Sequence, residues 1–116
     1  MFGFGLKDKA KKILEDDIGV FSPTPSWLNH IVSEGKKQEY NEYDIAICYC
    51  ITEWDFEIDQ AIKFDSNKEY IHQQIKSQRE KLSKIEHLAH QDLTFQDLSF
   101  RKKIDQIVKK SEELLK

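Results

Sequence analysis

Between Lys36 and Phe64 the chain contains neither glycine nor proline, and this uninterrupted run limits its fold more than any other feature. The run has no residue typical of a tight hairpin turn, so it predicts one long element. A strand has some local support, because residues 53–59 alternate between acidic and apolar side chains and residues 45–51 are rich in β-formers. A single strand of that length would be exceptional.

A helix explains the same run better. At about 100° per residue, one face of such a helix collects apolar side chains. These residues are Tyr43, Ile47, Cys50, Ile51, Trp54, Ile58, Ala61 and Ile62. Glu39 and Glu42 suit the N-terminus of a helix, where the macrodipole favours negative charge. We therefore predict a helix over about residues 38–64, with a strand as the alternative.

The remainder of the chain is also helical in character. Two prolines and four glycines are too few for a turn-rich β-sandwich. Apolar spacing predicts helices over about residues 6–17, 25–34, 38–64, 67–91 and 95–115. The predicted fold is an all-α, single-domain antiparallel helical bundle of four to five helices over residues 1–116, in which residues 1–5 form a flexible tail.

Capping residues and helix breakers set the predicted boundaries. Gly19 and Gly35 are placed to end the first two helices. Thr24 followed by Pro25 fits an N-cap with proline at the first helical position. Two capping boxes are predicted to start the later helices, Ser66–Glu69 and Thr94–Asp97.

Residues 67–91 carry a regular apolar seam. Its members recur in 4-3 spacing: Ile71, Ile75, Gln78, Leu82, Ile85 and Ala89. This spacing is typical of an antiparallel bundle partner or of a short coiled-coil seam. Self-association through the seam, as a homodimer with a structural or adaptor role, is therefore one alternative.

The net charge of −3 is unevenly distributed. Residues 38–67 contain eight carboxylates and one lysine, and both flanking segments are mildly basic. Without a dominant basic stripe, direct binding to nucleic acid is not expected. No apolar run approaches the ~20 residues of a membrane span, so no membrane partner is expected. Cys48 and Cys50 are too close together to staple a fold, and free thiols suggest a reducing, cytoplasmic location.

The central helix has a second apolar side. Ile45, Tyr49 and Phe56 lie opposite its main stripe. Such a helix is either central in its bundle or presents the second side to a partner. Aromatic side chains are frequent interface anchors, and carboxylates around them steer a basic partner. The residues predicted to bind a partner are Asp44, Tyr49, Glu53, Asp55, Phe56, Glu57 and Asp59.

These features predict a small acidic protein-binding module that is not an enzyme. Immunity proteins, which neutralise basic nuclease toxins, are similar in size, charge and helical class, although no stretch of this chain matches a particular immunity family. We therefore expect an inhibitor or immunity-type protein that docks on a basic toxin or nuclease. The competing interpretation is that the aromatic residues belong to the core and that the acids keep the protein soluble.

An enzyme of the helical-bundle type is the remaining alternative. Carboxylates four residues apart share one helix face and can serve acid–base chemistry. Two such pairs occur, Glu53/Glu57 and Asp55/Asp59. The candidate metal ligands are Glu86, His87 and His90. Because solvated acids and structural histidines are far commoner than sites, we predict no catalytic residue, metal ligand or cofactor.

Overall fold

Most of the part of the chain that the structure describes is helical. The computed structural model describes residues 5–64, 67–89 and 98–115, and the side chains of all of these except 98–101. Its helices are α1 (Leu6–Lys12), the π-helical turn η1 (Ile13–Ile18), α2 (Pro25–Lys37), α3 (Glu42–Lys63), α4 (Lys68–Ala89) and α5 (Leu98–Glu113). No strand occurs within these ranges. The predicted all-α bundle is confirmed, and the strand alternative is wrong.

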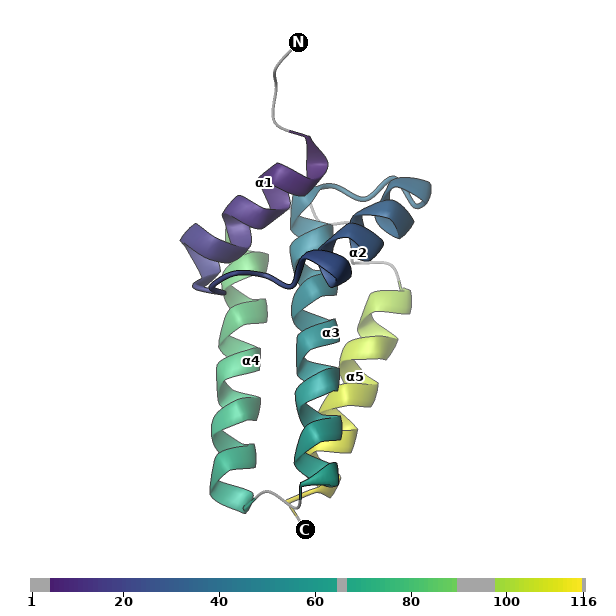
Figure 1. Ribbon diagram of the computed structural model, residues 1–116. Coiled ribbons are helices and arrows are strands. Elements are labelled where there is room, and N and C mark those ends of the chain that lie inside the picture. Colours follow the sequence, from purple (N-terminus) through teal and green to yellow (C-terminus); the bar gives the residue numbers. More distant parts are fainter. Residues whose placement is uncertain (1–4, 65–66, 90–97, 116) are drawn as a thin grey trace.

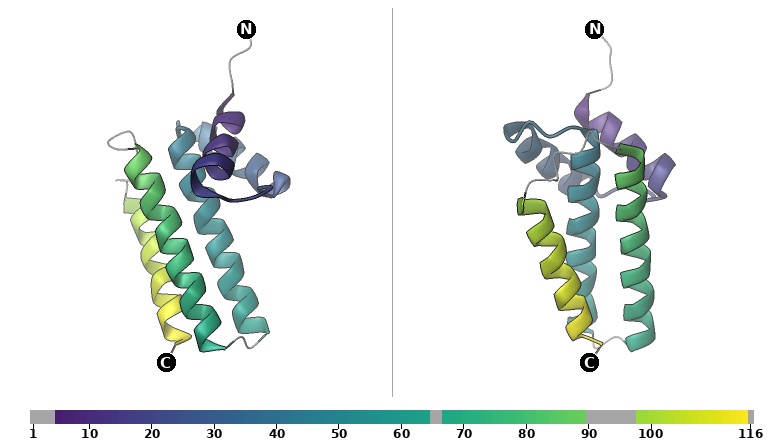
Figure 2. Two further views of the ribbon diagram at one scale, coloured as in Figure 1. Left: turned by 90° about the vertical axis from the view of Figure 1, so that its left-hand side faces the viewer. Right: turned by 180° about the vertical axis from the view of Figure 1, so that it is seen from behind.

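Helix α3 lies at the centre of the bundle and contacts every other helix. Helices α4 and α5 flank it along its length, and α4 runs antiparallel to both (Figure 1). Helices α1 and α2 lie across the N-terminal half of α3, as the two further views in Figure 2 confirm. The N-terminal half of α3 is therefore covered on more sides than its C-terminal half.

The predicted apolar stripe of α3 forms much of the core. Its fully or nearly fully buried members are Ile47, Cys50, Ile51, Trp54, Ile58 and Ala61. Tyr43 is half-buried at one end of the stripe, and Ile62 is 50% exposed at the other. The helical periodicity was therefore sufficient to find the core face, whereas the two ends of the stripe are only partly covered.

Helix α3 begins four residues later than predicted. Gln38 is the C-cap of α2, and Glu39 adopts a left-handed φ of 59° where the chain turns. Asn41 is the N-cap of α3: its side chain accepts hydrogen bonds from the backbone N–H groups of Tyr43 and Asp44, both at 3.0 Å. Asp44 accepts in return from the N–H of Asn41 at 2.9 Å, which completes a capping box.

Gly35 does not end α2, contrary to the prediction, because α2 continues to Lys37. Gly35 is buried, and a Cβ atom added to it would overlap the Cδ1 atom of Ile45 on α3. The absence of a side chain lets α2 approach α3 closely at this point. Gly35 is therefore a packing glycine rather than a helix breaker.

The first two helix boundaries were predicted more accurately. Gly19, with a φ of 85°, caps the helical segment that starts at Leu6. Pro25 is the first residue of α2 and Thr24 is its N-cap, although the Thr24 side chain makes no capping hydrogen bond. Of the expected tail, residues 1–4 lie outside the described residues, and Gly5 is the N-cap of α1.

Helix α4 starts after Asn67, whose side chain accepts a 2.8 Å hydrogen bond from the N–H of Tyr70. Ser66 of the predicted capping box lies outside the described residues, as do Thr94 and Asp97 of the second box. All members of the predicted 4-3 seam of α4 are buried inside the monomer. The seam lies on the helix that packs against α3, as expected of an antiparallel bundle partner, and self-association through it stays a prediction.

Candidate functional site

The predicted ridge of Ile45, Tyr49 and Phe56 does not form one surface. Ile45 and Tyr49 are buried, whereas Phe56 is 47% exposed. The ridge runs from the half of α3 that α1 and α2 cover into the half that is less covered, where α2 reaches it only through Trp27 (Figure 1). Only its last residue can therefore meet a partner directly.

Tyr49 was predicted to bind a partner, but it has an internal role. Its hydroxyl oxygen accepts a 2.8 Å hydrogen bond from the backbone N–H of Thr24, at the start of α2. Its ring lies 6.0 Å from that of Trp27. Tyr49 therefore links α2 to α3. Because its side chain is buried, it is not part of the surface that a partner could contact.

Asp44, which was also predicted to bind a partner, has an internal role as well. It is fully buried and serves as the acidic member of the capping box with Asn41. A carboxylate in the first turn also interacts favourably with the helix macrodipole. Its function is to start α3, and its burial excludes contact with a partner.

Glu53 is held by α4. Its carboxylate lies 2.7 Å from the ammonium of Lys81 and accepts a 3.1 Å hydrogen bond from the amide of Gln78. The side chains of Glu53 and Lys81 are only 17% and 22% exposed. This half-buried ion pair joins α3 to α4, because water competes weakly for either charge.

Asp55 and Asp59 share one cation from α5. The ammonium of Lys110 lies 3.3 Å from the carboxylate of Asp55 and 2.5 Å from that of Asp59. The hydrogen bond to Asp59, followed by the effects of Asp55, raises the pKa of Lys110 above its usual range. Both carboxylates stay about half exposed, so this contact leaves part of their charge at the surface.

Glu57 is the least satisfied acid of the set. Burial, and then repulsion from Glu53, raise the pKa of its carboxyl above the ordinary value. Its Oε2 atom is buried and has no hydrogen-bond partner among the described residues. Unlike Glu53, Asp55 and Asp59, it forms no ion pair with any side chain that the structure describes.

A groove opens beside Phe56 and Glu57 where α3 passes into α4. We call it the aromatic groove; it has a volume of about 470 Å³. Its lining residues are Phe56, Glu57, Gln60, Ala61, Phe64, Asn67 and Tyr70. Phe64 and Tyr70 are 67% and 44% exposed. At the other edge of Phe56, the ring of Trp27 packs against it in a T-shaped arrangement with centroids 5.2 Å apart.

Sequence reasoning missed Trp27, Phe64 and Tyr70 as members of this surface. Phe64 lies eight residues after Phe56, close to the same helical face, and this spacing could have indicated it. Trp27 and Tyr70 come from α2 and α4. No spacing within α3 could reveal them, because only the packing of helices brings them to Phe56.

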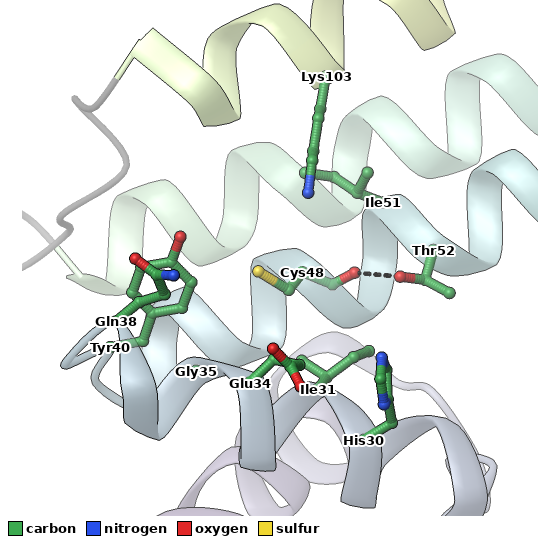
Figure 3. Close-up of a pocket in the computed structure, with 10 residues that line it drawn as sticks. All are labelled: His30, Ile31, Glu34, Gly35, Gln38, Tyr40, Cys48, Ile51, Thr52 and Lys103. Atoms are coloured by element: carbon green, nitrogen blue, oxygen red, sulfur yellow. Dashed lines mark hydrogen bonds between the residues drawn. The ribbon is translucent and has the colours of Figure 1, made fainter.

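A second, polar cleft lies between α2, α3 and α5 and has a volume of about 380 Å³ (Figure 3). Lys103 reaches into it from α5, above Cys48 and Thr52 of α3. Burial raises the pKa of the Cys48 thiol to about 12, so the thiol stays protonated at neutral pH and is a poor nucleophile. The Thr52 hydroxyl donates to the backbone carbonyl of Cys48 at 2.8 Å. These groups do not form a nucleophile–base pair.

The candidate metal ligands are not assembled into a site within the described ranges. Glu86 and His87 are exposed on α4, and His90 lies outside the described residues. Among the described side chains, no group of three or more histidine, cysteine or acidic residues could hold a metal ion. In the same part of the chain, no helix has the length and apolar character needed to cross a membrane.

The chain was also compared with known proteins. No protein-family model matches it, and neither a curated protein nor a solved structure does.

Proposed function

We propose that this protein is a non-catalytic protein-binding module that docks on a basic protein partner, as an inhibitor or immunity protein does. The docking face consists of Phe56, the aromatic groove, and the acids Asp55 and Asp59 beside it. The observation that supports this most is the exposed Phe56 ring, held edge-on by Trp27 among carboxylates. A positioned aromatic ring surrounded by charge is typical of an interface anchor.

The charge of this face supports a basic partner. The face carries three carboxylates, and Glu57 is the one that forms no ion pair among the described side chains. Two lysines oppose them: Lys110, which contacts Asp55 and Asp59, and Lys63, which lies over the Phe64 ring. The face therefore keeps an excess of one negative charge. Excess charge around an apolar anchor accelerates association with a partner of opposite charge and fixes its orientation.

The test is a differential capture of partners. Immobilised wild-type protein and its Phe56→Ala variant are incubated with extract of the source cells, at low and at high salt, and the retained proteins are identified by mass spectrometry. We expect a basic protein that the wild type retains and that is lost with Phe56→Ala, by about tenfold or more. Its retention also falls as salt rises, because ions screen the carboxylates.

Leu88→Ala is the matched control, because Leu88 is also exposed and apolar but lies at the opposite end of α4 from the aromatic groove. It should retain the partner as the wild type does. The proposal fails if every retained protein binds Phe56→Ala and Leu88→Ala equally. It also fails if the amount of retained partner does not change with the salt concentration.

A further inference from the structure

We propose that the aromatic groove is a binding pocket for one arginine side chain of the protein partner. The pocket combines a half-buried carboxylate, Glu57, with the aromatic rings of Phe56, Phe64 and Tyr70. This inference rests on the proposed function and adds the chemistry of the partner's anchor residue.

The carboxylate of Glu57 lacks the partners that the neighbouring acids have. Gln78 lowers the pKa of its carboxyl slightly, but its buried Oε2 atom has no hydrogen-bond partner among the described residues. Glu57 lines the groove, so a cation bound there lies beside a carboxylate that has no ion-pair partner among the described side chains. A positively charged donor interacts with a partly desolvated carboxylate more strongly than a neutral donor does.

The aromatic rings provide the second half of the recognition. Aromatic faces attract cations through their quadrupole, and the attraction grows when water is excluded. One such contact already exists at the groove, since the ammonium of Lys63 lies 5.6 Å from the centroid of the Phe64 ring. The rings of Phe56 and Tyr70 are exposed and can contact a further cation.

Arginine fits this pocket better than lysine. A guanidinium group is planar, stacks on aromatic rings and is more weakly hydrated than an ammonium group. Entry beside a half-buried carboxylate therefore involves a smaller loss of hydration. The several N–H groups of the guanidinium can reach Glu57 and the side-chain amide oxygen of Gln60 together, because both residues line the groove.

The test uses backbone amide shifts of the full chain in ¹H–¹⁵N NMR during titration with N-acetyl-arginine amide. N-acetyl-citrulline amide has nearly the same shape without the charge, and N-acetyl-lysine amide carries the charge without the planar guanidinium group. We expect weak saturable binding of the arginine compound, with the largest shifts at Phe56, Glu57 and Tyr70. Binding of the citrulline compound should be weaker by about tenfold or more.

Two variants complete the test. Glu57→Gln should weaken arginine binding by about tenfold, because the charge-assisted hydrogen bond is lost. Glu80→Gln, an exposed acid on α4, should leave it unchanged. Equal binding of arginine and citrulline, an unaffected Glu57→Gln variant, or lysine binding as tight as arginine binding would each overturn the inference.

The two proposals can fail separately. If partner capture depends on Phe56 while the arginine compound does not shift the groove, the arginine pocket is wrong and the docking face stands. If arginine binds the groove but no partner depends on Phe56, the arginine pocket stands and the docking face is wrong.

Discussion

The two halves of α3 share several types of residue but have different surroundings. Each half contains carboxylates and aromatic residues, yet Asp44 and Tyr49 are buried whereas Phe56 and Asp59 are exposed. The N-terminal half lies beneath α1 and α2, whereas the C-terminal half is flanked by α4 and α5 and touched by α2 only through Trp27 at Phe56 (Figure 1). The same residue types therefore become core and capping groups in one half and surface groups, which form the proposed docking face, in the other. Four predictions test this contrast.

The largest expected effect separates two aromatic residues of the predicted ridge. Tyr49→Ala should lower the free energy of unfolding by about 3–5 kcal/mol, because it empties a buried site and leaves the Thr24 N–H without its acceptor. Phe56→Ala should lower it by about 1 kcal/mol, since half of that ring already faces water. Urea unfolding of both variants measures the difference. Equal losses would contradict the contrast between the two halves.

The close approach of α2 to the N-terminal half is tested at Gly35. Gly35→Ala should destabilise the protein by about 1–2 kcal/mol, because its Cβ overlaps the Cδ1 atom of Ile45. Ile45→Val removes that methyl group. In a double-mutant cycle the combined variant should therefore be more stable than the sum of the single changes predicts, by about 1 kcal/mol. Strict additivity would show that α2 and α3 are not in contact there.

The two lysines that bind α3 acids should differ in importance. Lys81→Met should lower the free energy of unfolding by about 1–2 kcal/mol, because Glu53 stays half-buried with only Gln78 as a partner. Lys110→Met should lower the free energy of unfolding by only about 0.5 kcal/mol, since its ion pairs are largely exposed. Added salt should diminish the second effect more than the first. The reverse order in thermal or urea unfolding would contradict the assignment.

The smallest effect concerns Glu57, which faces Glu53 on α3 and Gln78 and Lys81 on α4. Its pKa is raised in the folded protein, so the fold favours the protonated form. This favourable contribution is present below the unfolded pKa of about 4.5 and is lost as the pH rises through the folded pKa.

Glu57→Gln should consequently raise the stability at neutral pH by less than about 1 kcal/mol and have no such benefit below pH ~4. Unfolding curves over this pH range check the sign. Glu80→Gln, at an exposed acid of α4, is the matched control. A loss of stability for Glu57→Gln at neutral pH would mean that Glu57 is well satisfied in the free protein.

Much of the helical pattern followed from local spacing. The stripe from Ile47 to Ala61, the glycine cap at Gly19 and the start of α2 at Pro25 were all predicted from their own segments. Errors arose where the local sequence was compatible with two structural roles for the same residue. Gly35 can end a helix or allow close packing, and the Asn41–Asp44 capping box competed with the earlier acids Glu39 and Glu42 for the start of α3.

The candidate site was predicted only in part, because exposure is a property of the whole bundle. Phe56, Asp55 and Asp59 stay at the surface as expected, but Tyr49 and Asp44 do not. Glu53 is also withdrawn from the surface by its ion pair with Lys81. Nothing in the sequence near these residues distinguishes the exposed from the buried ones.

The sequence by itself determined that the chain is helical and which face of α3 enters the core, because backbone hydrogen bonding and the period of the helix act over a few residues. Only the tertiary structure decided how far α1 and α2 extend over α3, and with it the burial of Tyr49 and the exposure of Phe56. It also brought Trp27 and Tyr70 to Phe56 from two other helices. Such long-range contacts depend on how whole helices pack, which no local pattern encodes.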